Sequence, residues 1–316
     1  MRRPHQLAIG LLALALAAGV ARTRALAAEA ETAFPLDGPR IEAGGASLRY
    51  VDRGAGRPIV LIHGAYGGLE DWLATGILDD LAREHRVIAF DRPGHGGSSR
   101  PAPGVSSPIA QARVLRAALS RLGVERPLLV GFSWGGAAAL AWALDAPDEI
   151  RGLALVNPVA YPWPGPTGTA YVLAGLPLVG EVVAQAVAAP FGTLAARDAV
   201  ERAFAPAPVA ATFARSPIAL ALRPAAFRHE AQDMRLLKAA VAIQSPRYGA
   251  IRAPLAILAG RGDRVTYWDF HSERLERAVP GATLRVLDDG GHQLLHSHPA
   301  AVVEHVRDLA RRAAAR

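Results

Sequence analysis

Apolar and polar residues alternate in two different rhythms along residues 46–157. Short apolar runs are typical of buried strands, whereas apolar residues spaced three and four apart are typical of helices. Strands are predicted at 46–54, 58–64, 86–91, 128–132 and 151–157. Helices are predicted at 71–85, at 106–123 and directly after residue 133. This order predicts a mostly parallel β-sheet with helices on both faces, in which ligands bind at the carboxyl ends of the strands.

The rhythm stops at residue 159 and resumes at residue 251. The residues between are rich in Pro, Ala and Leu, show only short helix-like patterns and include no run typical of a core strand. Two more strands are predicted at 253–260 and 283–287, with a closing helix at 298–315. We therefore expect an α/β core at 45–158 and 251–316, and a helical cap at 159–250 inserted before the penultimate core strand.

The N-terminal residues have the pattern of an export signal. A basic start, MRRPHQ, precedes the apolar run LAIGLLALALAAGV, and the sequence ALA at 25–27 fits a cleavage site. We expect a signal peptide at 1–27, a linker at 28–44, and an exported bacterial protein that is periplasmic or secreted. The run is shorter than the roughly 20 residues that a spanning helix needs. Arg22 and Arg24 follow the run, which leaves an uncleaved membrane anchor as the alternative.

The formal charge of +7 does not indicate a nucleic-acid partner. All but one of the 35 basic residues are arginine, Lys238 being the single lysine. Without the four arginines of the leader, 31 basic residues stand against 28 acidic ones, and no dense basic stripe remains. The chain has no cysteine, which excludes disulfides, thiol chemistry and metal bound by cysteine.

Ser133 lies in the sequence Gly131-Phe132-Ser133-Trp134-Gly135, between a predicted strand and a predicted helix. In a G-x-S-x-G sequence at such a junction, a sharp strained turn lifts the serine hydroxyl clear of the sheet. Only glycine leaves room two residues to either side. The alternative is a structural turn with a capping serine, but the strand before it and the helix after it favour a nucleophile.

A serine hydroxyl is a weak nucleophile and needs a base that takes its proton. His292 follows the last predicted strand in a glycine-containing loop, at the carboxyl end of that strand. The alternatives, His296 and His298, fall at the start of the closing helix, where histidine is more often a surface or capping residue. We therefore predict that His292 is the base.

The base needs a carboxylate that orients it and stabilises its charged form. Asp263 ends the penultimate strand, again at the carboxyl edge of the sheet. The competing carboxylates are Asp269, in a predicted helix, and Asp288 and Asp289, which are close to the histidine along the chain. The order serine, aspartate, histidine on three strand ends is more specific than any one of the three residues alone.

Two backbone amides are the candidates for an oxyanion hole, a site that stabilises negative charge on the carbonyl oxygen. One is the amide of Trp134, directly after the nucleophile. The other is the amide of Ala65, in the glycine-rich loop HGAYGG that follows the strand at 58–64. We expect His63 in that loop to be a buried structural residue and not a base.

Five segments carry a resemblance to a known family: VLIHGAYGG, VIAFDRPGHGGSS, LVGFSWGG, LAILAGRGDRV and LDDGGHQLLHSHP. Each resembles a segment of the α/β-hydrolase superfamily. The five segments also follow the order and spacing of that superfamily, over about residues 45–316. The likeness is to serine-nucleophile members with a helical cap, namely esterases, C–C bond hydrolases and cofactor-free haloperoxidase-like proteins. Epoxide hydrolases and haloalkane dehalogenases carry aspartate at the nucleophile position, so their alkyl-enzyme intermediate is not expected. In the family pattern, Asp91 and the glycines after it shape a structural turn.

The residues and the resemblance together predict a serine hydrolase that acts on a small-to-medium hydrophobic ester through an acyl-enzyme. The pocket is expected to include the side chains of Tyr66 and Trp134, with no metal and no cofactor. The expected partner is a small molecule; the sequence indicates no oligomeric state, and a membrane is involved only if the leader stays uncleaved. The same triad could instead cleave a C–C bond or an amide, or transfer an acyl group. A non-catalytic ligand-binding protein with this fold is the third alternative.

Overall fold

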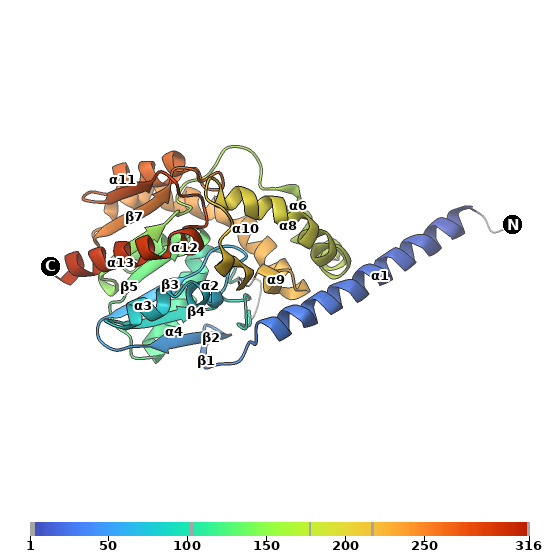
Figure 1. Cartoon of the computed structure of the whole chain (residues 1–316), viewed down its shortest axis with the longest axis horizontal. Coiled ribbons are helices and arrows are strands. Elements are labelled where there is room, and N and C mark those ends of the chain that lie inside the picture. The colour runs from blue at the N-terminus through green and yellow to red at the C-terminus, as the bar shows by residue number, and fades with distance from the viewer. Residues whose placement is uncertain (1–3, 101–103, 177, 216–217, 315–316) are drawn as a thin grey trace.

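One eight-stranded sheet organises the chain in the computed structural model, which describes residues 4–100, 104–176, 178–215 and 218–314 (Figure 1). The strands are β1 (Arg40–Ala43), β2 (Ala46–Arg53), β3 (Pro58–Ile62), β4 (Arg86–Phe90), β5 (Leu128–Phe132), β6 (Gly152–Val156), β7 (Leu255–Gly260) and β8 (Thr283–Leu287). Their order across the sheet is β1-β2-β4-β3-β5-β6-β7-β8. Only the β1–β2 and β2–β4 pairs are antiparallel, which confirms the predicted mostly parallel sheet.

Strand β1 lies in the segment that was expected to be a linker, so that expectation was wrong for residues 40–43. Ala43 pairs with Ala46 across a two-residue turn made by Gly44 and Gly45. Both glycines have positive φ, +57° and +78°, the conformation of the tightest hairpin turns. The two adjacent glycines were therefore a hairpin signal that the hydrophobic pattern alone does not reveal.

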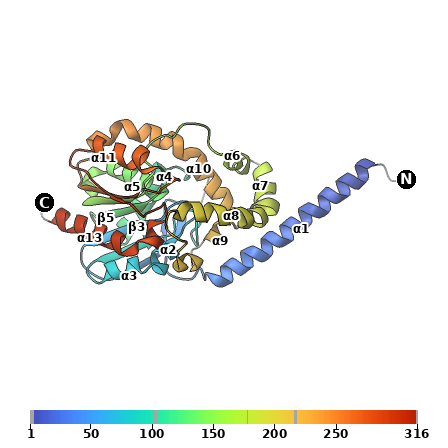
Figure 2. The same cartoon turned by 45° about the horizontal axis from the view of Figure 1, so that its top comes forward.

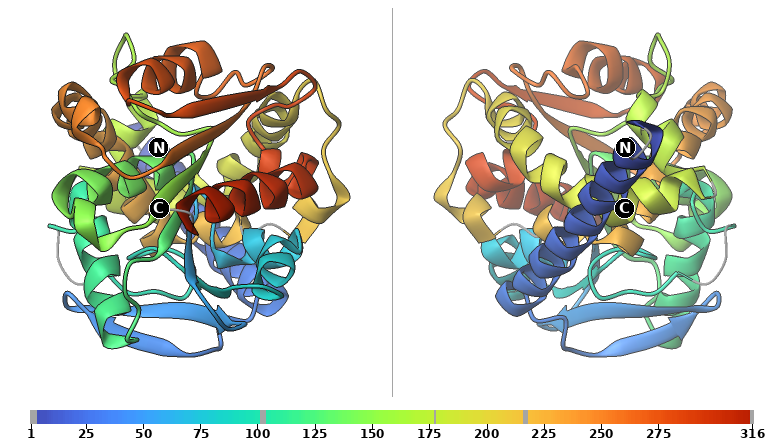
Figure 3. Two further views of the ribbon diagram at one scale, coloured as in Figure 1. Left: turned by 90° about the vertical axis from the view of Figure 1, so that its left-hand side faces the viewer. Right: turned by 90° about the vertical axis from the view of Figure 1, so that its right-hand side faces the viewer.

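Helices cover both faces of the sheet (Figure 3). They are α2 (Leu69–Ala74), α3 (Ile77–Ala82), α4 (Pro108–Arg121), α5 (Trp134–Asp145), α11 (Arg274–Ala278), α12 (Leu294–Ser297) and α13 (Pro299–Ala314). Side chains of α4, α5 and α11 pack with Val60 and Ile62 on one face, and those of α2, α3, α12 and α13 pack with Ile59 and Leu61 on the other. Successive residues of β3 enter opposite cores because side chains alternate along a strand.

The helix predicted at 71–85 is broken in two. Helix α2 ends at Ala74 and α3 begins at Ile77, with Gly76 between them at φ +75°. A left-handed residue cannot continue an α-helix, and glycine is the residue that adopts this conformation most easily. The apolar spacing runs through the break because both short helices bury the same face, so hydrophobic periodicity could not show it.

The described residues between β6 and β7 form helices and no strand, as expected for the cap. These helices are α6 (Thr169–Ala174), α7 (Val179–Val183), α8 (Ala189–Phe204), α9 (Ile218–Ala221) and α10 (Pro224–Gln244). They lie at the edge of the sheet where the parallel strands end (Figure 2). Helix α10 reaches back over the core, where Leu237 and Val241 join the cluster of α4 and α5.

The N-terminal segment forms one helix, α1 (Pro4–Ala33), which projects away from the body of the molecule (Figures 1 and 2). Residues 8–33 are long and apolar enough to cross a membrane. In the outer half, Ile9 and Leu14 are each 68% exposed. In the inner half, Thr23 and Ala30 are buried against the cap. The helix continues without a break through the predicted cleavage site.

Candidate active site

Ser133 occupies the turn between β5 and α5 in a strained backbone conformation. Its φ of 51° and ψ of −114° lie outside the regions that non-glycine residues ordinarily adopt. A Cβ on Gly131 would lie 2.7 Å from the carbonyl oxygen of Gly135, and one on Gly135 would lie 2.2 Å from that of Ile62. Both positions therefore require glycine for steric reasons, as expected for a G-x-S-x-G turn.

His292 and Asp263 lie in line with Ser133. The Nε2 atom of His292 is 3.1 Å from the Oγ atom of Ser133, and its Nδ1 atom is 2.8 Å from the Oδ2 atom of Asp263. All three side chains are buried in the protein; Ser133 and His292 border one cavity, and Asp263 lies behind the histidine. The tertiary structure thus brings the three predicted residues together, in the spatial arrangement of a nucleophile, a base and an orienting carboxylate.

The electrostatics of Asp263 keep it ionised. Burial by itself raises the pKa of this carboxyl, but attraction to His292 and hydrogen bonds from His292 and Thr266 outweigh burial and bring the pKa to about 2. The Oδ1 atom also accepts the backbone N–H groups of Val265 and Thr266, at 2.7 and 2.9 Å. An ionised Asp263 accepts a hydrogen bond from the Nδ1–H group of His292, which leaves Nε2 without a proton and free to accept that of Ser133.

Two residues that sequence reasoning missed hold this arrangement in place, Thr266 and Asn157. The Nδ2 atom of Asn157 donates to the carbonyl oxygens of Gly291 and His292, at 3.0 and 2.9 Å. Its Oδ1 atom accepts the N–H of Gly260 at the end of β7, at 3.0 Å. Asn157 follows β6 directly, so a polar residue after a buried strand was the only signal that could have identified it.

The cap also supports the histidine loop. The backbone N–H groups of His292 and Gln293 both donate to the carbonyl oxygen of Ala203 in α8, at 2.7 and 3.1 Å. The ring of Phe132 lies 5.2 Å from the ring of His292, centroid to centroid. Phe132 is buried in the core, and it also contributes to the cavity wall.

The alternative residues make other contacts, although Asp269 also borders the cavity. His296 is paired with Asp71, with 3.2 Å between Nε2 and Oδ1, and His298 lies 3.2 Å from Asp289. Asp288 pairs with Arg261 at the surface, and Asp269 is at the start of a short helical turn. None of these groups contacts Ser133 through a hydrogen bond in the described part of the chain, which favours the predicted trio.

The candidate oxyanion residues, Ala65 and Trp134, border the same cavity as Ser133 and His292. A Cβ on the neighbouring Gly64 would lie 3.1 Å from the Cβ of Ser133, so the loop after β3 approaches the nucleophile closely. The side chain of Trp134 is fully buried, and the Cζ atom of Arg92 lies 3.9 Å from its ring. This residue therefore stacks against a buried cation as well as bordering the cavity.

A cavity of about 810 Å³ opens above Ser133, within the range of small-molecule sites. Its wall is mostly apolar and aromatic, and the cap supplies much of it: Trp163, Tyr171, Val200, Phe213, Ile218, Met234 and Leu237. Tyr66 also lines it, and its hydroxyl donates to the hydroxyl of Tyr171 at 3.1 Å. Among the described residues, no group of three or more potential ligands is arranged to hold a metal ion.

Comparison with known proteins agrees with this geometry. Residues 57–299 match the model of the alpha/beta hydrolase fold family. The dihydrolipoyllysine-residue acetyltransferase component of an acetoin cleaving system from Cupriavidus necator is 40% identical over 119 residues, which cover 37% of this chain and 31% of the relative. The 2-hydroxy-6-oxo-2,4-heptadienoate hydrolase of Pseudomonas putida is 39% identical over 126 residues, which cover 39% and 45%.

Likeness to solved structures extends over most of the chain. Est816, an N-acyl homoserine lactone degrading enzyme, has a TM-score of 0.64 and 27% identity, covering 85% of this chain and 99% of that one. By contrast, the chain spans less than half the length of the two curated relatives. Because the family model matches more than half of the residues, the chain belongs to the alpha/beta hydrolase fold family.

Proposed function

We propose that the protein is a serine hydrolase that cleaves an uncharged, hydrophobic ester. The observation that carries this proposal is the continuous chain of contacts from Asp263 through His292 to Ser133 at the floor of an apolar cavity. Each residue type has the chemistry that its position requires: a hydroxyl nucleophile, a base in reach of its proton, and an ionised carboxylate behind the base.

The proposed reaction has two stages. The Ser133 oxygen attacks the acyl carbon while its proton passes to Nε2 of His292, and the amides of Ala65 and Trp134 stabilise the negative oxygen. The leaving alcohol takes the proton from His292, and an acyl-enzyme on Ser133 remains. Water then attacks this acyl group, giving its proton to His292, and the carboxylic acid leaves as Ser133 regains the proton. Asp263 stabilises the positive imidazolium in both stages.

The cavity supports an uncharged substrate. Its wall has no unpaired cationic side chain among the described lining residues, so a charged acid would lose its hydration without gaining a partner. Est816, which is similar over most of the chain, degrades a lactone, and a lactone is a cyclic ester. The same molecule also carries an amide, so this relatedness supports cleavage of a carboxylic acid derivative, an ester or an amide, here as well.

Hydrolysis of a C–C bond is the second candidate. The relative from Pseudomonas putida is a 2-hydroxy-6-oxo-2,4-heptadienoate hydrolase. The same serine and histidine could serve this reaction, with a stabilised carbanion as the leaving group in place of an alkoxide. A screen of products with a dienoate substrate distinguishes the two reactions, since only this bond cleavage yields a shortened enol acid.

The deciding experiment is hydrolysis of p-nitrophenyl esters from acetyl to decanoyl by the wild type and by Ser133→Ala. We expect the variant to lose several orders of magnitude in kcat, the scale for removal of a triad nucleophile. The chain length with the highest kcat/KM then measures the depth of the cavity. Equal, near-background rates in both proteins would reject ester hydrolysis. Failure of a fluorophosphonate to label Ser133 would favour a non-catalytic ligand-binding protein.

We also propose that the protein is exported, with α1 as the export segment. The apolar side chains of its outer half are exposed, which is unfavourable in water and suits insertion into a membrane during translocation. Cleavage after residue 27 is expected to give a protein beginning at Ala28, detectable by intact mass. Recovery of the uncleaved chain in the membrane fraction would make α1 an anchor, held to the cap by its buried residues Thr23 and Ala30.

The division into a core at 45–158 and 251–316 and a cap at 159–250 remains part of this proposal. It is supported by the position of the five cap helices between β6 and β7 and by their share of the cavity wall. The proposed substrate specificity therefore depends chiefly on the cap.

A further inference from the structure

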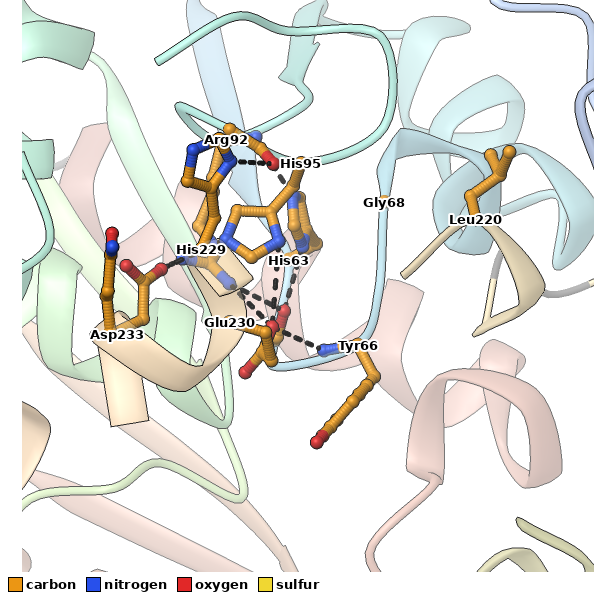
Figure 4. Close-up of polar contacts among 12 residues, drawn as sticks. His63, Tyr66, Gly68, Arg92, His95, Leu220, His229, Glu230 and Asp233 are labelled. Atoms are coloured by element: carbon orange, nitrogen blue, oxygen red, sulfur yellow. Dashed lines mark hydrogen bonds and ion pairs between the residues drawn. The ribbon is translucent and has the colours of Figure 1, made fainter. Parts of the chain in front are cut away.

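A buried cluster of charged residues lies beside the proposed active site and has no part in the proposed chemistry. Two carboxylates of cap helix α10, Glu230 and Asp233, meet Arg92 and His95 from the loop after β4, and all four are essentially inaccessible to solvent (Figure 4). Asp233 accepts from Nη1 of Arg92 at 2.9 Å, and His95 lies 3.0 Å from the same carboxylate. Burying several charges is costly unless the groups are paired and hydrogen-bonded.

One contact of this cluster reaches the peptide unit that joins Gly64 to the candidate oxyanion residue Ala65. The carbonyl oxygen of Gly64 accepts from Nη2 of Arg92 at 3.1 Å and lies 2.8 Å from Nδ1 of His63. The backbone N–H of Arg92 donates to Nε2 of His63 at 2.9 Å, so the proton of the neutral ring is on Nδ1 and is donated to Gly64. Burial and the nearby Arg92 lower the pKa of His63 well below its ordinary value, which keeps the ring neutral.

A trans peptide unit is planar, and its N–H points opposite to its carbonyl. Holding the Gly64 oxygen therefore fixes the direction of the Ala65 N–H. Arg92 is itself held by Asp233 of the cap, so α10 influences this amide through the guanidinium. A charge-assisted hydrogen bond to the carbonyl also polarises the peptide, which makes its N–H a stronger donor.

Glu230 holds the next peptide unit directly. Its Oε2 atom accepts the backbone N–H of Tyr66 at 3.1 Å, as Figure 4 shows. Tyr66 has a φ of 56°, a left-handed conformation that costs an aromatic residue about 1 kcal/mol or more and persists only when neighbouring groups enforce it. The carboxylate of Glu230 is thus placed to enforce the turn that follows Ala65.

We infer that Glu230 is a positioning residue: from the cap, it holds the Tyr66 amide and thereby keeps the Ala65 N–H directed at the reacting oxygen. This inference rests on the proposed function, because it assigns the Ala65 amide to the oxyanion hole. If Glu230 has this role, the rate of the chemical step depends on how α10 packs on the core. A cap that shifts by a fraction of an ångström would misdirect a donor on which acyl transfer depends.

The surroundings of Glu230 are mixed in charge. Arg92 lies 4.0 Å away, Nη2 to Oε2, and Nδ1 of His95 lies 3.6 Å away, with Arg100 and Asp233 further out. Burial is the largest influence and, with Asp233, raises the pKa of Glu230 to about 7 against the opposing effects of the arginines and the Tyr66 N–H. The second oxygen, Oε1, has no hydrogen-bond partner in the described structure, which is a reason why ionisation is costly.

The test compares Glu230→Ala, Glu230→Gln and a matched control, His229→Ala, in the full chain. The alanine variant removes the acceptor for Tyr66, whereas glutamine keeps an oxygen that can accept it. His229 is the neighbouring residue of α10, and its Nδ1 atom contacts the Gly94 carbonyl at 3.0 Å, a cap-to-core contact away from the oxyanion loop. Glu230→Leu, which fills the same space, replaces the alanine variant if that variant does not fold.

We expect Glu230→Ala to lower kcat for a p-nitrophenyl ester about 10- to 100-fold, with KM within about twofold, a part of the loss seen when an oxyanion donor is removed. Binding of a trifluoromethyl ketone, which forms a tetrahedral adduct, is expected to weaken by a similar factor. Glu230→Gln is expected to retain kcat within about threefold, and His229→Ala within about twofold, even where the Tm falls.

Three results would overturn the inference: wild-type kcat in Glu230→Ala, equal losses in Glu230→Ala and Glu230→Gln, or an equal loss in His229→Ala at a similar Tm. Ser133→Ala, measured in parallel, separates this outcome from failure of the proposed function. If Ser133→Ala is inactive while Glu230→Ala is unimpaired, only the positioning role is rejected. If Ser133→Ala retains wild-type activity, the proposed function and the inference are rejected together.

Discussion

Replacing Asp263 by asparagine is expected to reverse the proton on His292 with little change in shape. In the wild type, Oδ1 of Asp263 accepts two backbone N–H groups, from Val265 and Thr266, while Oδ2 faces Nδ1 of His292 at 2.8 Å. Backbone donors cannot become acceptors, so the single oxygen of asparagine must take the Oδ1 position. Its NH₂ group then faces His292, and Nδ1 must accept. The ring proton moves to Nε2, where it blocks acceptance of the Ser133 proton.

The size of the effect follows from the loss of the base. With its proton on Nε2, His292 donates toward Ser133 at 3.1 Å and cannot activate it. We expect kcat to fall on the order of 10⁴-fold, the scale found when a triad tautomer is reversed, which corresponds to about 5 kcal/mol in the activation free energy. KM is expected to change little, because Asp263 does not border the cavity among the described lining residues.

The stability of the variant tests the same electrostatics. Because the folded pKa of Asp263, about 2, lies below the ordinary 3.8, its ionised form stabilises the native state above pH 3.8, and this stabilisation is lost as pH falls through about 2. The variant lacks this contribution, on the order of 2 kcal/mol at pH 7. We therefore expect a Tm a few degrees lower, with a folded protein at assay temperature.

The assay is ester hydrolysis at pH 7 to 8 with thermal unfolding of each protein in the same buffer. Asp288→Asn serves as the control, since this exposed carboxylate pairs with Arg261 at the surface and makes no contact with His292 in the described structure. It is expected to keep kcat within about twofold. A kcat for folded Asp263→Asn within tenfold of the wild type would refute the assignment of Asp263 as the orienting carboxylate.

Three further outcomes are expected. Gly135→Ala places a Cβ 2.2 Å from the Ile62 carbonyl and is expected to destabilise the protein by about 3 kcal/mol or more in urea unfolding. The control is Gly281→Ala, whose added Cβ would meet no atom within 4 Å. Because Gly281 has a φ of +75°, this control shows the smaller cost of backbone strain alone. Asn157→Ala leaves the Gly291 and His292 carbonyls and the Gly260 N–H without their partner. We expect a loss of about 3 kcal/mol in the free energy of unfolding and a lower kcat. An unchanged kcat would show that the loop of His292 keeps its conformation without Asn157. The raised pKa of Glu230 means that the folded state binds more protons than the unfolded state between pH 4.5 and about 7. The contribution of Glu230 to the free energy of unfolding is therefore expected to fall as pH rises across this window, by on the order of 3 kcal/mol. In urea unfolding at pH 5 and pH 8, Glu230→Gln should remove this contribution, while that of Glu70, whose pKa is also raised to about 7, remains.

The sequence alone predicted strands β2 to β8 and the order of the candidate residues along the chain. The apolar runs that became β3 to β7 are buried on both faces, and such strands have a simple, continuous hydrophobic pattern. Gly131, Ser133 and Gly135 were recognisable because a strained turn tolerates few residue types. The catalytic role of Ser133 is a prediction that the ester assay tests.

The hydrophobic pattern failed at two places where a local backbone conformation, and not an apolar side chain, decides the structure. The hairpin at Gly44 and Gly45 and the break at Gly76 both depend on left-handed glycine conformations. Hydrophobic periodicity does not report backbone handedness, so it joined α2 to α3 and passed over β1. Glycine chemistry was the relevant signal in both cases.

Only the tertiary structure revealed the residues that hold the site. Asn157 contacts residues 134 and 135 positions away along the chain, and Glu230 contacts Tyr66 across 164 positions. A buried polar side chain has no periodic signature, because its position is decided by one partner and not by a repeating face. The sequence therefore determined which elements form and where the chemistry-bearing residues fall on them. Packing within the core and of the cap on the core decided which buried polar groups meet, since these contacts exist only after distant segments have come together.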